Sequence, residues 1–84
     1  MKELIEYIAK RLVDKPEDVR VTEEKIDEET TLFILKVSKN DVGKVIGKQG
    51  NTVNAMRVLL GAVGGKMHKK IALKIFDYLK KEGK

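Results

Sequence analysis

The chain has 84 residues, of which 42% are hydrophobic and 37% charged, and a formal net charge of +5. This size and composition predict one small globular domain over residues 1–84 with a single core, and they exclude a disordered chain. The sequence has no cysteine, no recognisable signal peptide and no apolar run long enough to span a membrane, so we expect a cytoplasmic protein without disulfides or thiolate metal sites.

The first predicted element is a helix whose apolar residues recur at helical spacing: Leu4, Ile5, Ile8, Leu12 and Val13. The helix ends before Pro16, because a proline disfavours helical geometry in the residue that precedes it. Val19 and Val21 then alternate with polar residues, as in an exposed strand. Residues 31–37, TLFILKV, have the β-branched and apolar content of a central strand. The acidic stretch 23–29 predicts a turn, so we expect these two strands to pair as a hairpin.

A short second helix is predicted before Gly47. Ser38 and Asp41 have the spacing of a capping box, which indicates a helix start. A third helix follows Gly50, with apolar residues on one face: Val53, Met56, Leu59, Leu60 and Val63. Three glycines should weaken and then stop this helix: Gly61, Gly64 and Gly65.

The last apolar segment fits either a strand or a helix. Ile71, Leu73 and Ile75 alternate as in a strand, whereas Ile71, Ile75 and Leu79 also lie on one helical face. We predict a strand over residues 70–77, followed over residues 78–84 by a short helix or a frayed tail. The expected order is therefore helix, strand, strand, helix, glycine turn, helix, strand.

The glycine turn, Gly47 to Gly50, lies in the basic part of the chain. Residues 1–35 carry six Lys or Arg against ten Asp or Glu, a net charge of −4, whereas residues 36–84 carry twelve against three, a net charge of +9. Such asymmetry is typical of a surface that binds a polyanion, although solvated lysines explain it equally well. Lys48 is followed by Gln49, and a Walker loop needs a Ser or Thr at that position, so a P-loop nucleotide site is excluded.

Two interpretations of this turn remain open from its residues alone. It is either a plain connection between two helices, or a turn whose glycines let a phosphate backbone approach the amides at the start of the third helix. In the second interpretation Lys48 adds positive charge and Gln49 a hydrogen-bonding amide.

Residues 41–53, DVGKVIGKQGNTV, resemble the signature of KH domains, in which an apolar V-I-G precedes a basic G-x-x-G loop. The opening segment MKELIEYIAKRLVDKPEDV and the order of elements resemble the small bacterial KH-domain RNA-binding proteins of the KhpA type, across nearly the whole chain. This resemblance implies an α+β fold of the type II KH arrangement, with three strands in a mixed sheet and helices on one face.

The resemblance also implies a function and a set of site residues. A G-x-x-G loop clamps the backbone of four nucleotides, so single-stranded RNA is the expected ligand and single-stranded DNA the alternative. The expected backbone contacts are Gly47, Lys48, Gln49 and Gly50. The candidates for an apolar floor under the bases are Ile46 and Val53, although helix-facing residues of this kind more often belong to the core. Further phosphate contacts are expected from Lys44 and Arg57, for which surface solvation is an equal alternative.

Partners are implied by the same resemblance. Proteins of the KhpA type are associated with self-pairing and with a larger KH-containing partner of the Jag (KhpB) kind, in post-transcriptional regulation and in cell elongation or division. The alternative function is therefore a protein-interaction module in which RNA binding is secondary. No nucleophile, base and orienting acid form a recognisable signature, and the lone His68 has no metal-ligand companions, so we expect no catalysis, no cofactor and no metal.

Overall fold

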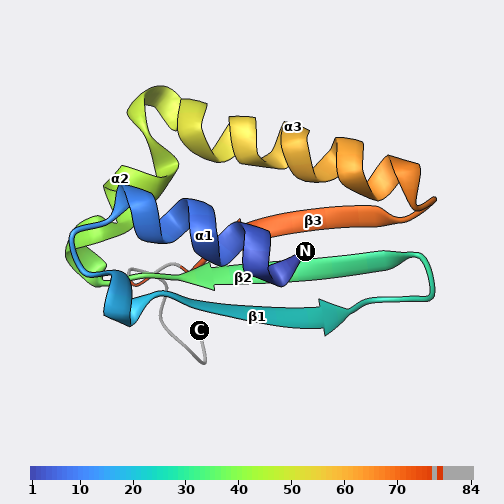
Figure 1. Cartoon of the computed structure of the whole chain (residues 1–84), viewed down its shortest axis with the longest axis horizontal. Helices are drawn as coiled ribbons and strands as arrows, with labels where there is room; N and C mark the ends of the chain where they lie inside the picture. Colours follow the sequence, from blue (N-terminus) through green and yellow to red (C-terminus); the bar gives the residue numbers. More distant parts are fainter. Residues whose placement is uncertain (77, 79–84) are drawn as a thin grey trace.

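The computed structural model describes residues 1–76 and 78 (Figure 1). The helices and strands follow the predicted order: α1 Lys2–Leu12, β1 Arg20–Lys25, β2 Thr30–Lys36, α2 Val42–Ile46, α3 Asn51–Lys66 and β3 Lys70–Ile75. Short 3₁₀ turns lie between them: η1 Pro16–Asp18, η2 Lys39–Asp41 and η3 Lys48–Gly50. No helix in the described part of the chain is long and apolar enough to cross a membrane.

The three strands form one mixed sheet in the order β1-β2-β3. The β1–β2 hairpin is antiparallel and places Val21 opposite Leu35, whereas β3 runs parallel to β2 and places Leu73 beside Phe33. A parallel neighbour needs a crossover connection, which α2 and α3 supply. The helices cover one face of the sheet (Figure 1), and this confirms the expected α+β fold.

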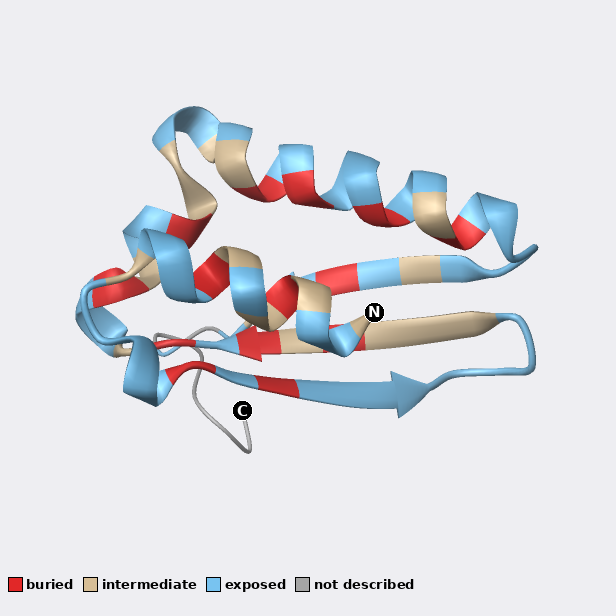
Figure 2. Cartoon of the chain, viewed as in Figure 1, coloured by how far each residue is buried: buried red, intermediate tan, exposed pale blue. Residues whose placement is uncertain are grey.

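The core lies between the helices and that face of the sheet, where buried residues of both layers meet (Figure 2). Its buried members from the helices are Ile5, Ala9, Val45, Val53, Met56 and Leu60, and those from the sheet are Val21, Phe33, Leu35 and Leu73. Phe33 and Leu35 of β2 are buried, whereas Ile34 between them is only partly buried, which is the pattern of a strand with one face on the core.

The third helix ends at Lys66, one residue after the last of the three glycines, as predicted, but Gly61 and Gly64 lie inside it and do not interrupt it. Gly64 is buried, and a Cβ atom there would lie 2.6 Å from Cγ1 of Ile71 and 2.8 Å from the carbonyl oxygen of Lys69. A close approach between the end of α3 and β3 therefore explains this glycine. The packing energy of the helix face outweighs a helix propensity loss of about 1 kcal/mol per glycine.

The predicted capping box is also wrong. Neither Ser38 nor Asp41 makes a side-chain cap, and the only bond between them is the backbone N–H of Asp41 to the carbonyl of Ser38, at 2.8 Å. Oδ2 of Asp41 instead accepts a hydrogen bond of 3.0 Å from the backbone N–H of Lys15. With only 2% of its surface exposed, Asp41 is a buried link between the segment after α1 and the start of α2.

The final segment forms a strand as predicted, but β3 ends at Ile75, so Phe76, which the prediction included, lies just beyond it. The rest of the predicted strand and tail, at Asp77 and at residues 79–84, lies outside the described residues. Tyr78 is described, and its hydroxyl donates a hydrogen bond of 2.6 Å to the carbonyl oxygen of Val37.

Candidate functional site

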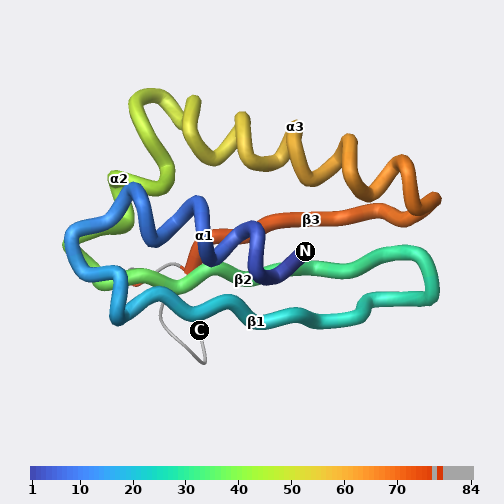
Figure 3. The backbone as a smooth tube through the Cα atoms, in the orientation of Figure 1, coloured from blue at the N-terminus to red at the C-terminus, as the bar shows by residue number. Residues whose placement is uncertain are grey.

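The turn between α2 and α3 (Figure 3) has a backbone with positive φ angles, which its two glycines allow. α2 ends at Gly47, which has φ 80° and ψ 172°, and α3 begins after Gly50, which has φ 78° and ψ 10°. Between them Gln49 is left-handed, with φ 57°. Glycine adopts positive φ without steric cost, so the two glycines allow the chain to reverse within four residues.

Gly47 is required for a second reason, its close approach to the start of α3. A Cβ atom at position 47 would contact the side chain of Thr52 and lie 2.8 Å from the backbone nitrogen of that residue. A Cβ atom at Gly50 would have only Asn54 nearby, with Nδ2 at 3.8 Å. The first glycine therefore packs against α3, whereas the second faces open space.

The start of α3 adds hydrogen-bond donors to this turn. The first amides of a helix have no partner within the helix, and no side chain caps the N-terminus of α3. Lys48 and Gln49 are exposed, and both glycines are half-buried. The amides of Gly50 and Asn51 already donate to the carbonyls of Gly47 and Lys48. The groups left for an anion are therefore the next amides of α3, the positive end of its dipole and the exposed Lys48, which together favour phosphate.

The predicted flanking residues fall into two groups. Val53 is 6% exposed and packs in the core, whereas Ile46 is half-buried against the core beside the turn. Lys44 is exposed, and its Nζ lies 3.6 Å from Oδ2 of Asp14. Of the two candidates for an apolar floor, Ile46 therefore retains the more accessible surface.

Arg57 bridges α3 and the sheet. Its Nε donates a hydrogen bond of 3.2 Å to the carbonyl oxygen of Leu73 in β3, and Nη1 lies 3.4 Å from Oδ1 of Asn54. Because β3 is an edge strand, this hydrogen bond places the guanidinium at the edge of the sheet, next to α3. The sequence pattern did not predict this bridge, because its partner is a backbone carbonyl sixteen residues away.

The structure adds Thr52 and Asn54 to the surroundings of the turn, through the spaces beside Gly47 and Gly50. Polar residues in a first helical turn carry no distinctive signal, so the sequence did not single them out. Within residues 1–76 and 78, no group of three His, Cys, Asp or Glu side chains could hold a metal ion.

Comparisons with known proteins identify the family of the chain. The chain matches the family model described as "KhpA/KhpB, KH domain" over residues 2–75. It is 53% identical over 75 residues to the "RNA-binding protein KhpA" of Clostridium perfringens, covering 89% of this chain and 99% of the relative. It is also 53% identical over 77 residues to the protein of the same name in Listeria monocytogenes, covering 92% and 100%.

A more distant relative of the same name, from Chlamydia trachomatis, is 44% identical over 77 residues, with 92% of this chain and 97% of the relative covered. No solved structure gives a significant match. The family match over nearly the whole chain confirms the expected resemblance and its non-enzymatic class. The chain therefore belongs to the KhpA/KhpB family of KH domains.

Proposed function

We propose that this protein binds single-stranded RNA and clamps about four nucleotides at the Gly47–Gly50 loop. The observation that carries the proposal is the exposed, glycine-bounded turn at the uncapped start of α3. A strand backbone can approach there because no side chain projects from Gly50, whose Cβ position faces open space. The name shared by the relatives, RNA-binding protein KhpA, supports the same ligand.

The neighbouring residues have complementary roles in this proposal. Lys48 neutralises a phosphate and Gln49 donates or accepts a hydrogen bond at the sugar-phosphate backbone. Ile46 supplies apolar surface for a base, while Val53 supports it from the core. Lys44 and Arg57 lie on either side of the turn along the chain. To bind a phosphate, Lys44 must leave its ion pair with Asp14, and Arg57 must give up its hydrogen bond to the carbonyl of Leu73.

Amide chemical shifts test this proposal. A titration of the ¹⁵N-labelled protein with a single-stranded RNA oligomer should shift the amides of Gly47 to Thr52 first and most strongly. The amides at the tip of the β1–β2 hairpin, at the other end of the sheet from α2 (Figure 1), serve as the internal control. Equal shifts at the hairpin tip and the loop would contradict a localised clamp.

Single-stranded DNA is the alternative ligand, because phosphate contacts do not depend on the 2′-OH. The same titration with a DNA oligomer of matched sequence separates the two. We expect RNA to bind more tightly than DNA. Equal affinities for the two would mean that the site contacts the phosphates and does not recognise the 2′-OH.

We also infer that α3 pairs with another protein chain. Residues 58–65, VLLGAVGG, carry no charged or polar side chain, yet Val58 is 74% and Leu59 is 44% exposed. An apolar helix surface of this kind is typical of an interaction site. The expected partner is a second copy of the chain or a larger KH-containing protein of the Jag (KhpB) kind, in post-transcriptional regulation linked to cell elongation or division.

A charge on this surface tests the pairing. Leu59→Lys should shift the protein from dimer to monomer in sedimentation equilibrium, because a charge buried at an apolar interface has no partner. Ile26→Lys is the matched control, since Ile26 is 57% exposed at the hairpin tip, far along the chain from α3. A monomeric wild type would contradict self-pairing, and a Leu59→Lys variant that remains dimeric would contradict an interface on α3.

A further inference from the structure

A small cavity lies where β1 begins and β2 ends, away from the glycine turn. It has a volume of about 260 Å³ and is lined by Asp18, Arg20, Lys36, Ser38 and Tyr78. Sites for whole small-molecule ligands have volumes of roughly 300–1,000 Å³. The cavity is therefore slightly smaller than a site that encloses a whole small-molecule ligand, and it has ample room for a phosphate group.

The charges beside this cavity have an unusual arrangement. Arg20 and Lys36 are directly opposite each other in the antiparallel β1–β2 register, and like charges at opposite positions destabilise a sheet. Neither forms an ion pair with a carboxylate within the described residues. A bound anion between or beside them would relieve this repulsion.

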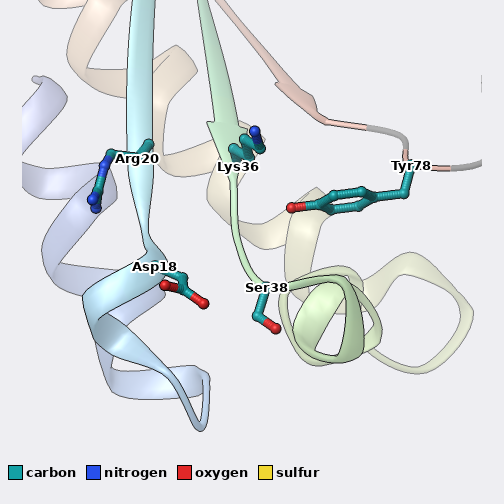
Figure 4. A pocket seen from close by; sticks show the side chains of 5 residues that line it. All are labelled: Asp18, Arg20, Lys36, Ser38 and Tyr78. Carbon is teal, nitrogen blue, oxygen red and sulfur yellow. The ribbon is translucent and has the colours of Figure 1, made fainter.

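The two basic side chains at the cavity, Arg20 and Lys36, are held differently (Figure 4). Arg20 bends away from Lys36, and its Nη1 is held by the carbonyl oxygens of Glu17 at 2.9 Å and Val19 at 2.8 Å. Lys36 is exposed, with Nζ 4.9 Å from the centre of the Phe76 ring. Because only backbone carbonyls hold Arg20 and only an aromatic ring holds Lys36, the exposed Lys36 is the cation that can turn from Phe76 to an anion in the cavity, while Arg20 contributes positive potential from a fixed position.

Two hydroxyl groups complete the polar lining. Tyr78 donates its proton to the carbonyl of Val37, which leaves its oxygen as an acceptor and fixes the ring beside the cavity. Ser38 has no side-chain hydrogen bond among the described residues and can donate to an anion. The Asp18 carboxylate lies across from Ser38 in Figure 4 and opposes an anion, so the intrinsic affinity must be low.

We propose that this cavity binds a phosphate group, and that the phosphate belongs to an RNA strand already held at the Gly47–Gly50 loop. The second part rests on the proposed function. Ser38 begins the segment that leads through η2 and α2 to Gly47. The start of β1, the end of β2 and the turn after α2 all lie at the same end of the molecule (Figure 1). A weak site becomes effective for a tethered ligand, because tethering raises its local concentration to the millimolar range.

Inorganic phosphate tests the site without RNA. A titration at constant ionic strength should shift the amides of Asp18 and Ser38. Lys36→Gln should weaken binding by roughly threefold, whereas Asp18→Asn should strengthen it by roughly twofold because the opposing charge is lost. Lys74→Gln is the matched control, since Lys74 is exposed on the same face of the sheet but does not line the cavity.

Three results of this titration would overturn the site: no shift at Asp18 and Ser38, an equal loss in Lys74→Gln, or weaker binding in Asp18→Asn. The Lys48→Asp, Gln49→Asp double variant separates this site from the loop. It should keep the phosphate shifts at Asp18 and Ser38 even if the loop proves not to bind RNA. Urea unfolding of each variant verifies that it is folded.

RNA length identifies the source of the phosphate. Lys36→Gln should leave the affinity for a four-nucleotide strand unchanged, because the loop alone accommodates it. It should weaken binding of a strand of about eight nucleotides by roughly twofold to fivefold, because a longer strand reaches both sites. An unchanged affinity for both lengths would overturn the assignment to RNA and leave a free phosphate compound as the ligand of the cavity.

Discussion

Gly47 and Gly50 bound the same turn, yet a side chain would have different consequences at each position. Gly47→Ala would force a Cβ atom against Thr52 in a backbone conformation that is essentially restricted to glycine, at a cost of about 3 kcal/mol of unfolding free energy. Gly50→Ala meets open space and costs about 1 kcal/mol for the left-handed conformation alone. Urea unfolding of the two variants measures this difference, and equal losses would contradict it.

Asp27 is a residue whose charge stabilises the hairpin turn. Its Oδ1 accepts hydrogen bonds from the backbone N–H groups of Glu29, at 2.9 Å, and Thr30, at 2.8 Å. These bonds favour the charged carboxylate and lower its pKa below the ordinary value of 3.8. A lowered pKa means that the folded state binds the proton less readily than the unfolded chain. The stabilisation is therefore present above pH 3.8 and is lost as the pH falls through the folded-state pKa.

Asp27→Asn tests this linkage because it keeps the acceptor oxygen and removes the charge. The variant should be less stable than the wild type at pH 6, and the difference should shrink as the pH falls below 3.8. Thermal unfolding across this pH range gives the comparison. A stability difference that does not change with pH would show that the carboxylate charge is not what stabilises the turn.

At the scale of elements, α2 is held in place by the buried carboxylate of Asp41. Its hydrogen bond to the Lys15 amide joins the start of α2 to the segment that follows α1. Asp41→Ala should lower the unfolding free energy by about 2 kcal/mol, because it removes a buried carboxylate and its charge-assisted hydrogen bond to the Lys15 amide. Asp14→Ala, which breaks the exposed ion pair with Lys44, should change it by about 0.5 kcal/mol or less. Similar losses in the two variants would contradict the role of Asp41.

The order of the elements could be predicted from the sequence because each element carries a local signal. The helical spacing of Leu4 to Leu12, the β-branched run that forms β2 and the glycines of the turn are all contained within about a dozen residues. The features that the sequence analysis missed or misjudged depend on contacts between segments that are distant in the chain. Gly64 is explained by Ile71, Asp41 by Lys15 and Arg57 by Leu73, and in each case the partner belongs to another element.

At the scale of the whole molecule, charge is separated between the two parts of the chain. Residues 1–35 carry the acidic excess and residues 36–84 the basic excess, and the Gly47–Gly50 loop lies in the basic part. If about three phosphates are neutralised, the logarithm of the RNA affinity should fall with the logarithm of salt concentration with a slope near −2. A fourfold increase in salt should then weaken binding by about tenfold to twentyfold. Anisotropy titrations at several salt concentrations measure this slope, and a slope near zero would contradict an electrostatic clamp.

The most direct test of RNA binding at the loop is a fluorescence anisotropy titration of labelled single-stranded RNA with the wild type and the Lys48→Asp, Gln49→Asp double variant. Both substituted side chains are exposed, so the variant should fold normally, which urea unfolding verifies. The wild type should bind and the folded variant should show no measurable binding, because two new carboxylates repel the phosphate backbone. Equal binding by the two proteins would contradict the clamp and assign RNA binding to the basic surface as a whole.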